Sequence, residues 1–339
     1  MSAITETTSL FAPAPRHPHS QYLVGPPPCS GAPRPDIVLV ALDGTERSDG
    51  ALRVALRRCE ALNATLAVLT IAWTEPVGPP VATILWHADN AAHRGNQRRA
   101  VEDQLVRVTG QPRVHGVAVL DGTPAYTIAR VAIERHAALV IVGLGRHGIA
   151  DRLFSEETAL ELVRHSRVPV LIVPEDVADT VSHAVVAVDF SEISARAAQA
   201  ALDTVEPNGI VELVHVMPYV PAYPFAIEDQ EPHERWAQSQ LDAVVGRLVV
   251  PPGVTIHRVV IRGRAVNALL AHTRRVGADL IVTGTHGPGF VERAMIGSVA
   301  TALLRGARCA VLSVPRDPLA ALALEKPRDT SADAPTPQE

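Results

Sequence analysis

The chain contains 339 residues, of which 47% are apolar and 4% aromatic. A chain of this length suits about two domains of ~150 residues, and its apolar content allows each of them a core of its own. The 31 basic and 36 acidic residues leave a net charge of -5, which excludes a general attraction to nucleic acid or to an anionic membrane. We expect neither as a partner.

The ends of the chain and its cysteines indicate a soluble, cytoplasmic protein. Residues 1–35 hold eight of the 28 prolines and residues 316–339 are mostly polar, which predicts two disordered tails. No basic segment leads into an apolar one at the N-terminus, and no apolar run approaches the roughly 18 residues of a spanning helix. Cys29, Cys59 and Cys309 are odd in number and lack metal-type spacing, so we expect neither a disulfide framework nor a metal site.

Between the tails the sequence repeats itself, and each copy predicts five strands with helices between them. The expected strands are 36–43, 65–71, 114–120, 139–143 and 170–174, then 184–189, 210–217, 255–261, 280–284 and 310–315. The expected helices include 48–62 and 91–108 in the first copy, and 191–205 and 233–248 in the second. This alternation is typical of an α/β fold. We predict two tandem domains, 36–174 and 183–315, each an open-twisted, parallel five-stranded sheet with helices on both faces.

The loop after the fourth strand of the second copy carries a phosphate-binding pattern. It reads Gly284-x2-Gly287, then nine residues, then Gly297-Ser298 at the start of the last helix. Ligands of open parallel sheets bind at the carboxyl ends of the strands, where glycines let backbone amides approach a phosphate. The helix start adds free N–H groups and a partial positive charge. Asp189 ends the first strand on the same rim, either to accept hydrogen bonds from a base or ribose or only to cap the next helix.

The pattern Gly284-x2-Gly287-x9-Gly297-Ser298, with the Leu-Ile-Val strand before it and the strand ending at Pro315 after it, closely resembles the universal stress protein family in its ATP-binding form. The resemblance covers both halves. It implies a Rossmann-like fold of the adenine nucleotide alpha hydrolase type that binds ATP or another adenine nucleotide, with or without Mg²⁺. The family usually has a bulky apolar residue where Thr283 stands. The residues that the resemblance assigns to the nucleotide are Ala187, Asp189, Val216, Thr283, Gly284, Gly287, Gly297, Ser298 and Val299.

The first copy departs from this pattern at the start of its last helix. Glu156-Glu157 stand where the second copy has Gly297-Ser298. A carboxylate about 4 Å from a phosphate charge costs roughly 4 kcal/mol at an effective dielectric constant of 20, so we expect the first half to bind a triphosphate weakly or not at all. A smaller anion, a Mg²⁺ ion on the two carboxylates, an adenosine-like ligand, or simply an acidic helix start remain as alternatives. A weak second site would consist of Asp43, Gly145 and Gly148.

No residues with a catalytic pattern stand out. The chain lacks Gly-x4-Gly-Lys-Ser/Thr, and no lysine lies in the phosphate loop. The leading hypothesis is a regulatory protein in which bound ATP biases conformation or partner choice. The alternatives are a slow ATPase that uses His286 or a metal-bound water, and a ligand-free interaction scaffold.

The fifth strands, 170–174 and 310–315, are apolar and lie at predicted sheet edges, which a protein must cover. Pairing them with each other would make the two domains an intramolecular pseudo-dimer. In universal stress proteins this strand is a common association edge, so the resemblance implies the same pairing. A homodimer of such tandems is a further hypothesis.

Overall fold

The computed structural model describes residues 36–72, 83–111, 116–145, 155–218, 230–285 and 297–316. For residues 83–90 and 230–231 it describes the backbone alone. The predicted tails, 1–35 and 316–339, lie outside the described residues except for Arg316, as do the loop glycines Gly148 and Gly287.

Strands and helices alternate through both halves, which confirms the predicted α/β class. The first half contains β1 (Ile37–Ala41), the 3-10 helix η1 (Glu46–Ser48), α1 (Asp49–Leu62), β2 (Thr65–Ala72), α2 (Thr83–Thr109), β3 (Val117–Asp121), α3 (Pro124–Glu134), β4 (Ala137–Leu144), α4 (Glu156–His165) and β5 (Val170–Pro174). The second half contains β6 (His183–Ala187), α5 (Glu192–Leu202), β7 (Ile210–Met217), α6 (Gln230–Val245), β8 (Thr255–Arg262), α7 (Ala265–Val276), β9 (Leu280–Gly284), α8 (Ser298–Gly306) and β10 (Ala310–Val314).

Local sequence explains most of the helix boundaries. Ser191 caps α5, because its side chain accepts a hydrogen bond from the backbone N–H of Ser194. Gly277 ends α7 in the left-handed conformation, at φ 64°. Helix α2 differs from the expectation: it starts at Thr83 rather than at residue 91. No proline follows Pro80 until residue 112, so the backbone can remain helical through residues 83–90.

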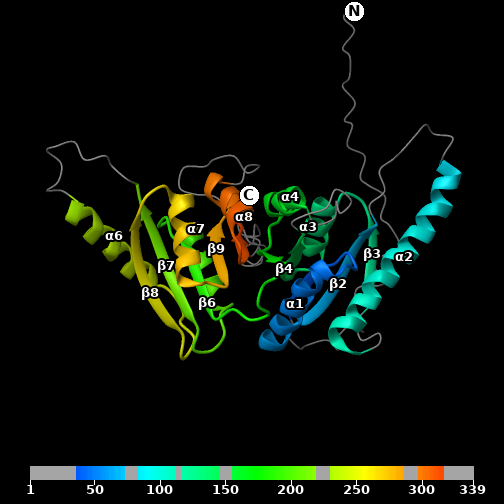
Figure 1. Ribbon diagram of the computed structural model, residues 1–339, viewed down its shortest axis with the longest axis horizontal. Helices are drawn as coiled ribbons and strands as arrows, with labels where there is room; N and C mark the ends of the chain where they lie inside the picture. The colour runs from blue at the N-terminus through cyan, green and yellow to red at the C-terminus, as the bar shows by residue number, and fades with distance from the viewer. Residues whose placement is uncertain are drawn as a thin grey trace, which may run out of the picture.

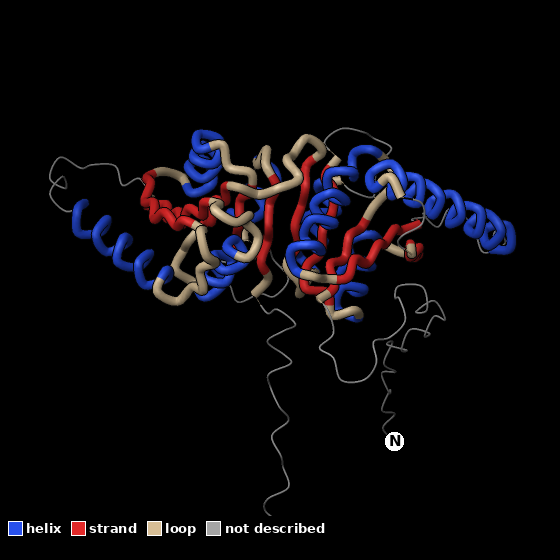
Figure 2. Tube along the Cα trace, turned by 90° about the horizontal axis from the view of Figure 1, so that it is seen from below, coloured by secondary structure: helices blue, strands red, loops and turns tan. Residues whose placement is uncertain are grey.

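The strands form one ten-stranded sheet in the order β3-β2-β1-β4-β5-β10-β9-β6-β7-β8 (Figures 1 and 2). Within each half all neighbours are parallel, and the order is that of a doubly wound Rossmann-like sheet. The halves meet where β5 and β10 pair antiparallel, with Leu171 opposite Leu312. The expected pair of five-stranded sheets is therefore continuous across the middle of the molecule.

Two apolar layers hold the helices on the two faces of the sheet. One buried cluster joins the sheet to α1, α2, α5 and α6, and the other joins it to α3, α4, α7 and α8. Figure 1 shows α7, α8, α4 and α3 in a row, with α8 and α4 side by side at the centre. Short Val, Leu, Ile and Ala runs form the strands because both faces of the sheet are covered.

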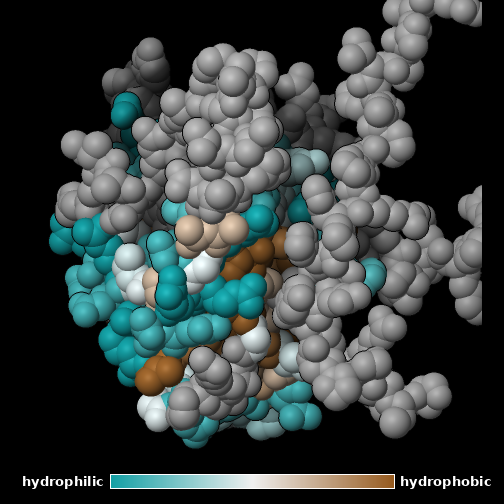
Figure 3. All heavy atoms as spheres, turned by 90° about the vertical axis from the view of Figure 1, so that its right-hand side faces the viewer, coloured by the Kyte–Doolittle hydropathy of each residue, from teal (hydrophilic) through white to brown (hydrophobic). Residues whose placement is uncertain are grey.

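On the end of the molecule built from the first domain, the described residues in view are mostly hydrophilic, with a narrow apolar strip (Figure 3). Charged residues on α2, such as Arg107 and Arg94, form ion pairs with Asp49 and Asp121 at this end. Among the helices that the structure describes, none is long and apolar enough to cross a membrane.

Leu312 tests the central strand pair, because its side chain is 2% exposed and its strand joins the two domains. We expect Leu312→Ala to lower the free energy of unfolding by about 2–5 kcal/mol, through lost apolar contacts and a cavity. Urea unfolding followed by circular dichroism measures this change. The matched control is Val249→Ala, since the side chain of Val249 is 76% exposed. Equal stability of the two variants would contradict the role given to the central pair.

Candidate functional site

A cavity of about 290 Å³ opens at the carboxyl ends of β6 and β9. These strands are neighbours in the sheet but not in the sequence, because the chain winds outward through β7 and β8 before it returns to β9. Such a reversal is where doubly wound sheets bind ligands. The predicted residues that line the cavity are Ala187, Asp189, Val216, Thr283, Gly284, Gly297, Ser298 and Val299. Gly287, the ninth, lies outside the described residues.

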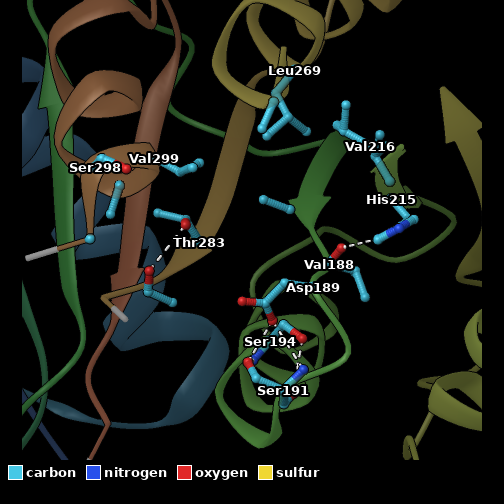
Figure 4. Close-up of a pocket in the computed structure, with 16 residues that line it drawn as sticks. Val188, Asp189, Ser191, Ser194, His215, Val216, Leu269, Thr283, Ser298 and Val299 are labelled. Atoms are coloured by element: carbon cyan, nitrogen blue, oxygen red, sulfur yellow. Dashed lines mark hydrogen bonds between the residues drawn. The ribbon is translucent and has the colours of Figure 1, made fainter. Parts of the chain in front are cut away.

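The cavity has an apolar side and a polar side (Figure 4). Val216 and Leu269 lie on one side, and Ser298 at the start of α8 lies on the other, with Thr283 between them. The volume lies at the lower end of the roughly 300–1,000 Å³ typical of small-molecule pockets. An elongated ligand with an apolar end and an anionic end fits this division.

Asp189 is held in a fixed orientation by the turn that follows it. Its Oδ1 accepts hydrogen bonds from the backbone N–H of Ser191, at 3.0 Å, and from the Ser191 hydroxyl, at 2.5 Å. The Ser191 hydroxyl in turn accepts from the backbone N–H of Ser194 at 3.2 Å. The second carboxylate oxygen of Asp189 points toward the middle of the cavity (Figure 4). A ligand donor can therefore bind there without disturbing the turn.

Helix α8 presents its N-terminus to the cavity without a capping side chain. Gly297 is the N-cap and makes no side-chain hydrogen bond, while its own N–H donates to the Thr285 carbonyl at 2.7 Å. The N–H groups of the first helical turn have no partner within a helix, so they carry a partial charge of about +0.5 toward the cavity. The exposed Ser298 adds a hydroxyl. This end of the cavity suits an anion.

Asp43 is the counterpart of Asp189 in the first half. Its Oδ1 accepts hydrogen bonds from residues of the loop that follows it. The Thr45 backbone N–H and hydroxyl donate to this oxygen at 2.9 and 2.8 Å, and the Ser48 hydroxyl donates at 2.6 Å. The Ser48 hydroxyl also accepts from Gln104 of α2 at 2.8 Å. Hydrogen bonds therefore connect this loop to helix α2.

Helix α2 packs against the Asp43–Gly44 loop of the first half. Gln97 Nε2 donates to the Asp43 carbonyl at 3.2 Å, and the Gly44 N–H donates to Gln104 Oε1 at 3.1 Å. A Cβ on Gly44 would lie only 2.5 Å from the Ala100 Cβ, and the φ of Gly44 is +83°, so both space and conformation require glycine. Side chains of α2 thus bind the Asp43–Gly44 loop at the strand ends of the first half.

The phosphate-loop pattern of the first half is also displaced along the chain. Gly143 pairs with Val173 next to Pro174, whereas Gly284 pairs with Val314 next to Pro315. Gly143 is therefore the counterpart of Gly284. Gly145, which begins the Gly145-x2-Gly148 element, lies two residues further along, and a Cβ there would approach Arg47 at 3.6 Å. Gly148 lies outside the described residues.

Helix α4 of the first half begins with its own cap and an ion pair. The Ser155 hydroxyl accepts from the Thr158 backbone N–H at 3.2 Å, which occupies the helix N-terminus. Glu156, the counterpart of Gly297, accepts at Oε1 from Arg305 Nε at 2.8 Å. Arg305 belongs to α8 of the second domain, so the carboxylate that replaces the glycine contacts the other half of the molecule.

Comparison with known proteins agrees with this architecture. The family model of the universal stress protein family matches residues 35–174 and again residues 180–315. The chain belongs to this family. A universal stress protein of Mycolicibacterium smegmatis is 27% identical over 293 residues, which cover 82% of this chain and 96% of that protein. Universal stress protein Rv2005c of Mycobacterium tuberculosis is 28% identical over 294 residues, covering 81% of this chain and 95% of that protein.

A solved universal stress protein from Archaeoglobus fulgidus has the same fold. It superposes with a TM-score of 0.58 at 18% sequence identity, and the match covers 84% of this chain and 97% of that one. The tandem arrangement therefore extends through nearly the whole length of these relatives.

Sequence reasoning missed part of the lining of this universal stress protein's cavity. His215 Nδ1 lies 2.8 Å from the Val188 carbonyl, and because a carbonyl only accepts, Nδ1 carries the hydrogen. The His215 ring stacks on Phe190, with the two ring centroids 4.2 Å apart, and Phe190 contacts Trp236 of α6 edge-on. The adjacency of His215 to Val216 was the available signal. The lining residues that were not predicted are Val188, Ser191, Ser194, Val214, His215, Ala265, Leu269 and Ala300.

A buried carboxylate supports helix α7, which contributes Leu269 to the cavity. Glu212 of β7 is 7% exposed and contacts two histidines, His183 Nε2 at 3.0 Å and His272 Nε2 of α7 at 2.5 Å. Arg275 contacts His272 Nδ1 at 2.8 Å, and because arginine only donates, His272 holds its hydrogen on Nε2 and donates it to Glu212. Burial raises the pKa of Glu212, but the hydrogen bonds and the charge interactions with His272 and His183 together outweigh burial and hold that pKa below its ordinary value.

We expect Glu212→Gln to lower the free energy of unfolding at pH 7 by about 1–3 kcal/mol, because the buried His272 and the partly buried His183 lose a charged acceptor. The depressed pKa makes the contribution of Glu212 fully present above the ordinary carboxyl pKa and lost as pH falls through the lower folded-state value. The wild type should therefore lose stability over this acidic window, and the variant should show a shallower dependence.

Urea unfolding at a series of pH values between neutral and acidic conditions measures this difference in slope. The control is Glu234→Gln, which removes an exposed carboxylate paired with Arg262 on the surface. Identical pH profiles for wild type and Glu212→Gln would show that the pKa of Glu212 is not lowered in the folded state.

Proposed function

We propose that the second domain of this universal stress protein binds an adenine nucleotide such as ATP, and that the first domain holds no nucleotide phosphates. The observation that carries the proposal is the division of the second-domain cavity into an apolar side and an uncapped helix N-terminus, with Asp189 on its rim. The family pattern Gly284-x2-Gly287-x9-Gly297-Ser298 supports the same assignment.

The apolar side suits the adenine ring. Ala187, Val216 and Leu269 provide a surface without charged groups against which a flat ring can pack. One carboxylate oxygen of Asp189 already accepts hydrogen bonds from Ser191. The other oxygen is left to accept from a ribose hydroxyl or a base amine. These contacts recognise adenosine whatever the number of phosphates.

The α8 end suits the phosphates. Backbone N–H groups at a helix start bind phosphate oxygens through hydrogen bonds and the helix dipole, and the Ser298 hydroxyl adds another donor. A bound triphosphate would bring its Mg²⁺ with it. In the first half the Ser155 side chain occupies the corresponding helix start, and the Glu156 carboxylate lies beside it. The occupied helix start and the carboxylate both disfavour the binding of a phosphate there.

The proposed role is regulatory, because α8 belongs to both the cavity and the interface between domains. Ser298, Val299 and Ala300 at its start line the cavity, and Arg305 near its end pairs with Glu156 of the first domain. A ligand that fixes the start of α8 therefore biases the contact at its end.

Gly297→Glu tests the phosphate end. Gly297 has φ -57° and ψ 146°, which any residue can adopt, and an acidic residue at a helix N-terminus is favourable, so the variant should fold. We expect its affinity for ATP to fall about 100-fold or more, because a carboxylate would lie beside the phosphates. Isothermal titration with ATP and with adenosine measures the effect. Adenosine is the internal control and should bind as in the wild type.

Asp189→Ala tests the adenosine end. We expect it to weaken ATP and adenosine alike, by about tenfold, because both lose one charge-assisted hydrogen bond. The matched variant Asp43→Ala in the first domain should leave both affinities unchanged. A stronger effect of Asp43→Ala than of Asp189→Ala would reverse the assignment of the halves.

Mass spectrometry of ligands retained by the purified wild type distinguishes the main alternatives. An adenine nucleotide lost from Gly297→Glu supports the proposal. A wild type that neither retains nor binds any adenine nucleotide would contradict it and leave the scaffold hypothesis. Single-turnover release of phosphate from bound ATP would add slow hydrolysis to binding.

A further inference from the structure

Among the residues that the structure describes, the phosphate end of the second-domain cavity carries little positive charge. Its described lining contains no lysine or arginine, and the helix terminus supplies only about half an elementary charge. ATP is a polyanion, and phosphates are most often paired with arginine or lysine in proteins. This inference rests on the proposed function and concerns a cation that pairs with the bound phosphates.

The two domains are related by an approximate twofold axis through the central strand pair. Leu171 lies opposite Leu312 in the antiparallel ladder, with one further pair on each side. Residues of the first domain near this axis therefore have counterparts 141 positions later, as 312 follows 171, and Pro174 and Pro315 keep the same spacing. Helices α4 and α8 lie against each other across the axis (Figure 1).

One contact across this axis is already present. Arg305 of α8 reaches the Glu156 carboxylate at the start of α4, at 2.8 Å. The counterpart of Arg305 is Arg164 in the last turn of α4, and the counterpart of Glu156 is Gly297. The same symmetry therefore brings Arg164 to the start of α8, where Gly297 has no side chain.

Arg164 is available for such a contact. It is exposed, and within the described part of the chain its guanidinium has no ion pair or hydrogen bond. The other basic residue of that turn, His165, instead places its ring edge-on against Tyr126 of α3, at 6.3 Å. Of the two basic side chains at the end of α4, Arg164 is the one left to face α8.

We propose that Arg164 of the first domain supplies a cation to the nucleotide phosphates bound at α8 of the second domain. The Glu156–Arg305 pair and the phosphate–Arg164 pair are then the two symmetry-related versions of one interaction. In the first, a carboxylate built into the chain is the anion. In the second, glycine leaves room and the ligand is the anion.

Titration of four variants of the full-length protein with ATP and adenosine tests this arrangement. We expect Arg164→Ala to lower ATP affinity about tenfold and Arg164→Glu to lower it further, because a charge-assisted pair is lost and then replaced by repulsion. Arg164→Lys should retain most of the affinity. The matched control is Arg130→Ala, which removes an exposed first-domain arginine paired with Glu134 on α3. Adenosine affinity should be unchanged throughout.

The outcomes separate this inference from the proposed function. If the wild type binds ATP and Arg164→Glu binds it as tightly as Arg130→Ala does, Arg164 has no part in the site although the site exists. Equal losses for adenosine and ATP in Arg164→Glu would also overturn the inference, since they would indicate a structural effect. If the wild type binds neither ligand, the proposed function and the inference fail together.

Discussion

The antiparallel pairing of β5 with β10 is the constraint on which the rest of the molecule depends. Both strands are short, apolar and fully covered, and each would otherwise leave an open sheet edge. Once they pair about Leu171 and Leu312, the last helix of each domain must lie antiparallel to the other across the same axis. The contact between the start of α4, at Glu156, and the last turn of α8, at Arg305, follows from that register.

The two halves place different side chains around the same strand ends. The sheet order is the same in both, so the carboxyl ends of the central strands are available in each. The difference lies in side chains supplied from elsewhere: Gln97 and Gln104 of α2 bind the Asp43 loop, and Ser155 caps α4. In the second half, Phe190 packs on His215 and Trp236, and His215 lines the cavity.

Much of the candidate site was predictable because it is local. The strand ends at Asp189 and Gly284 and the helix start at Gly297 are each marked by a short sequence pattern, and a parallel sheet brings such ends to one rim. The hydrogen bonds of α2 with the Asp43 loop were not predictable, because Gln97 and Gln104 lie more than 50 positions from the loop that they bind and carry no motif. Leu269 was missed for the same reason, since α7 reaches the cavity only through packing.

The sequence by itself determined the repeat, the α/β class, the strand ends that meet at the rim, and the replacement of Gly297 by Glu156 in the first copy. These follow from local propensity and from periodicity, which act over a few residues at a time. Only the tertiary structure decided that Glu156 pairs with Arg305, that Gly143 rather than Gly145 is the counterpart of Gly284, and that Glu212 lies buried between two histidines. Those outcomes depend on strand register and on packing between segments distant in the chain, which no short window of sequence contains.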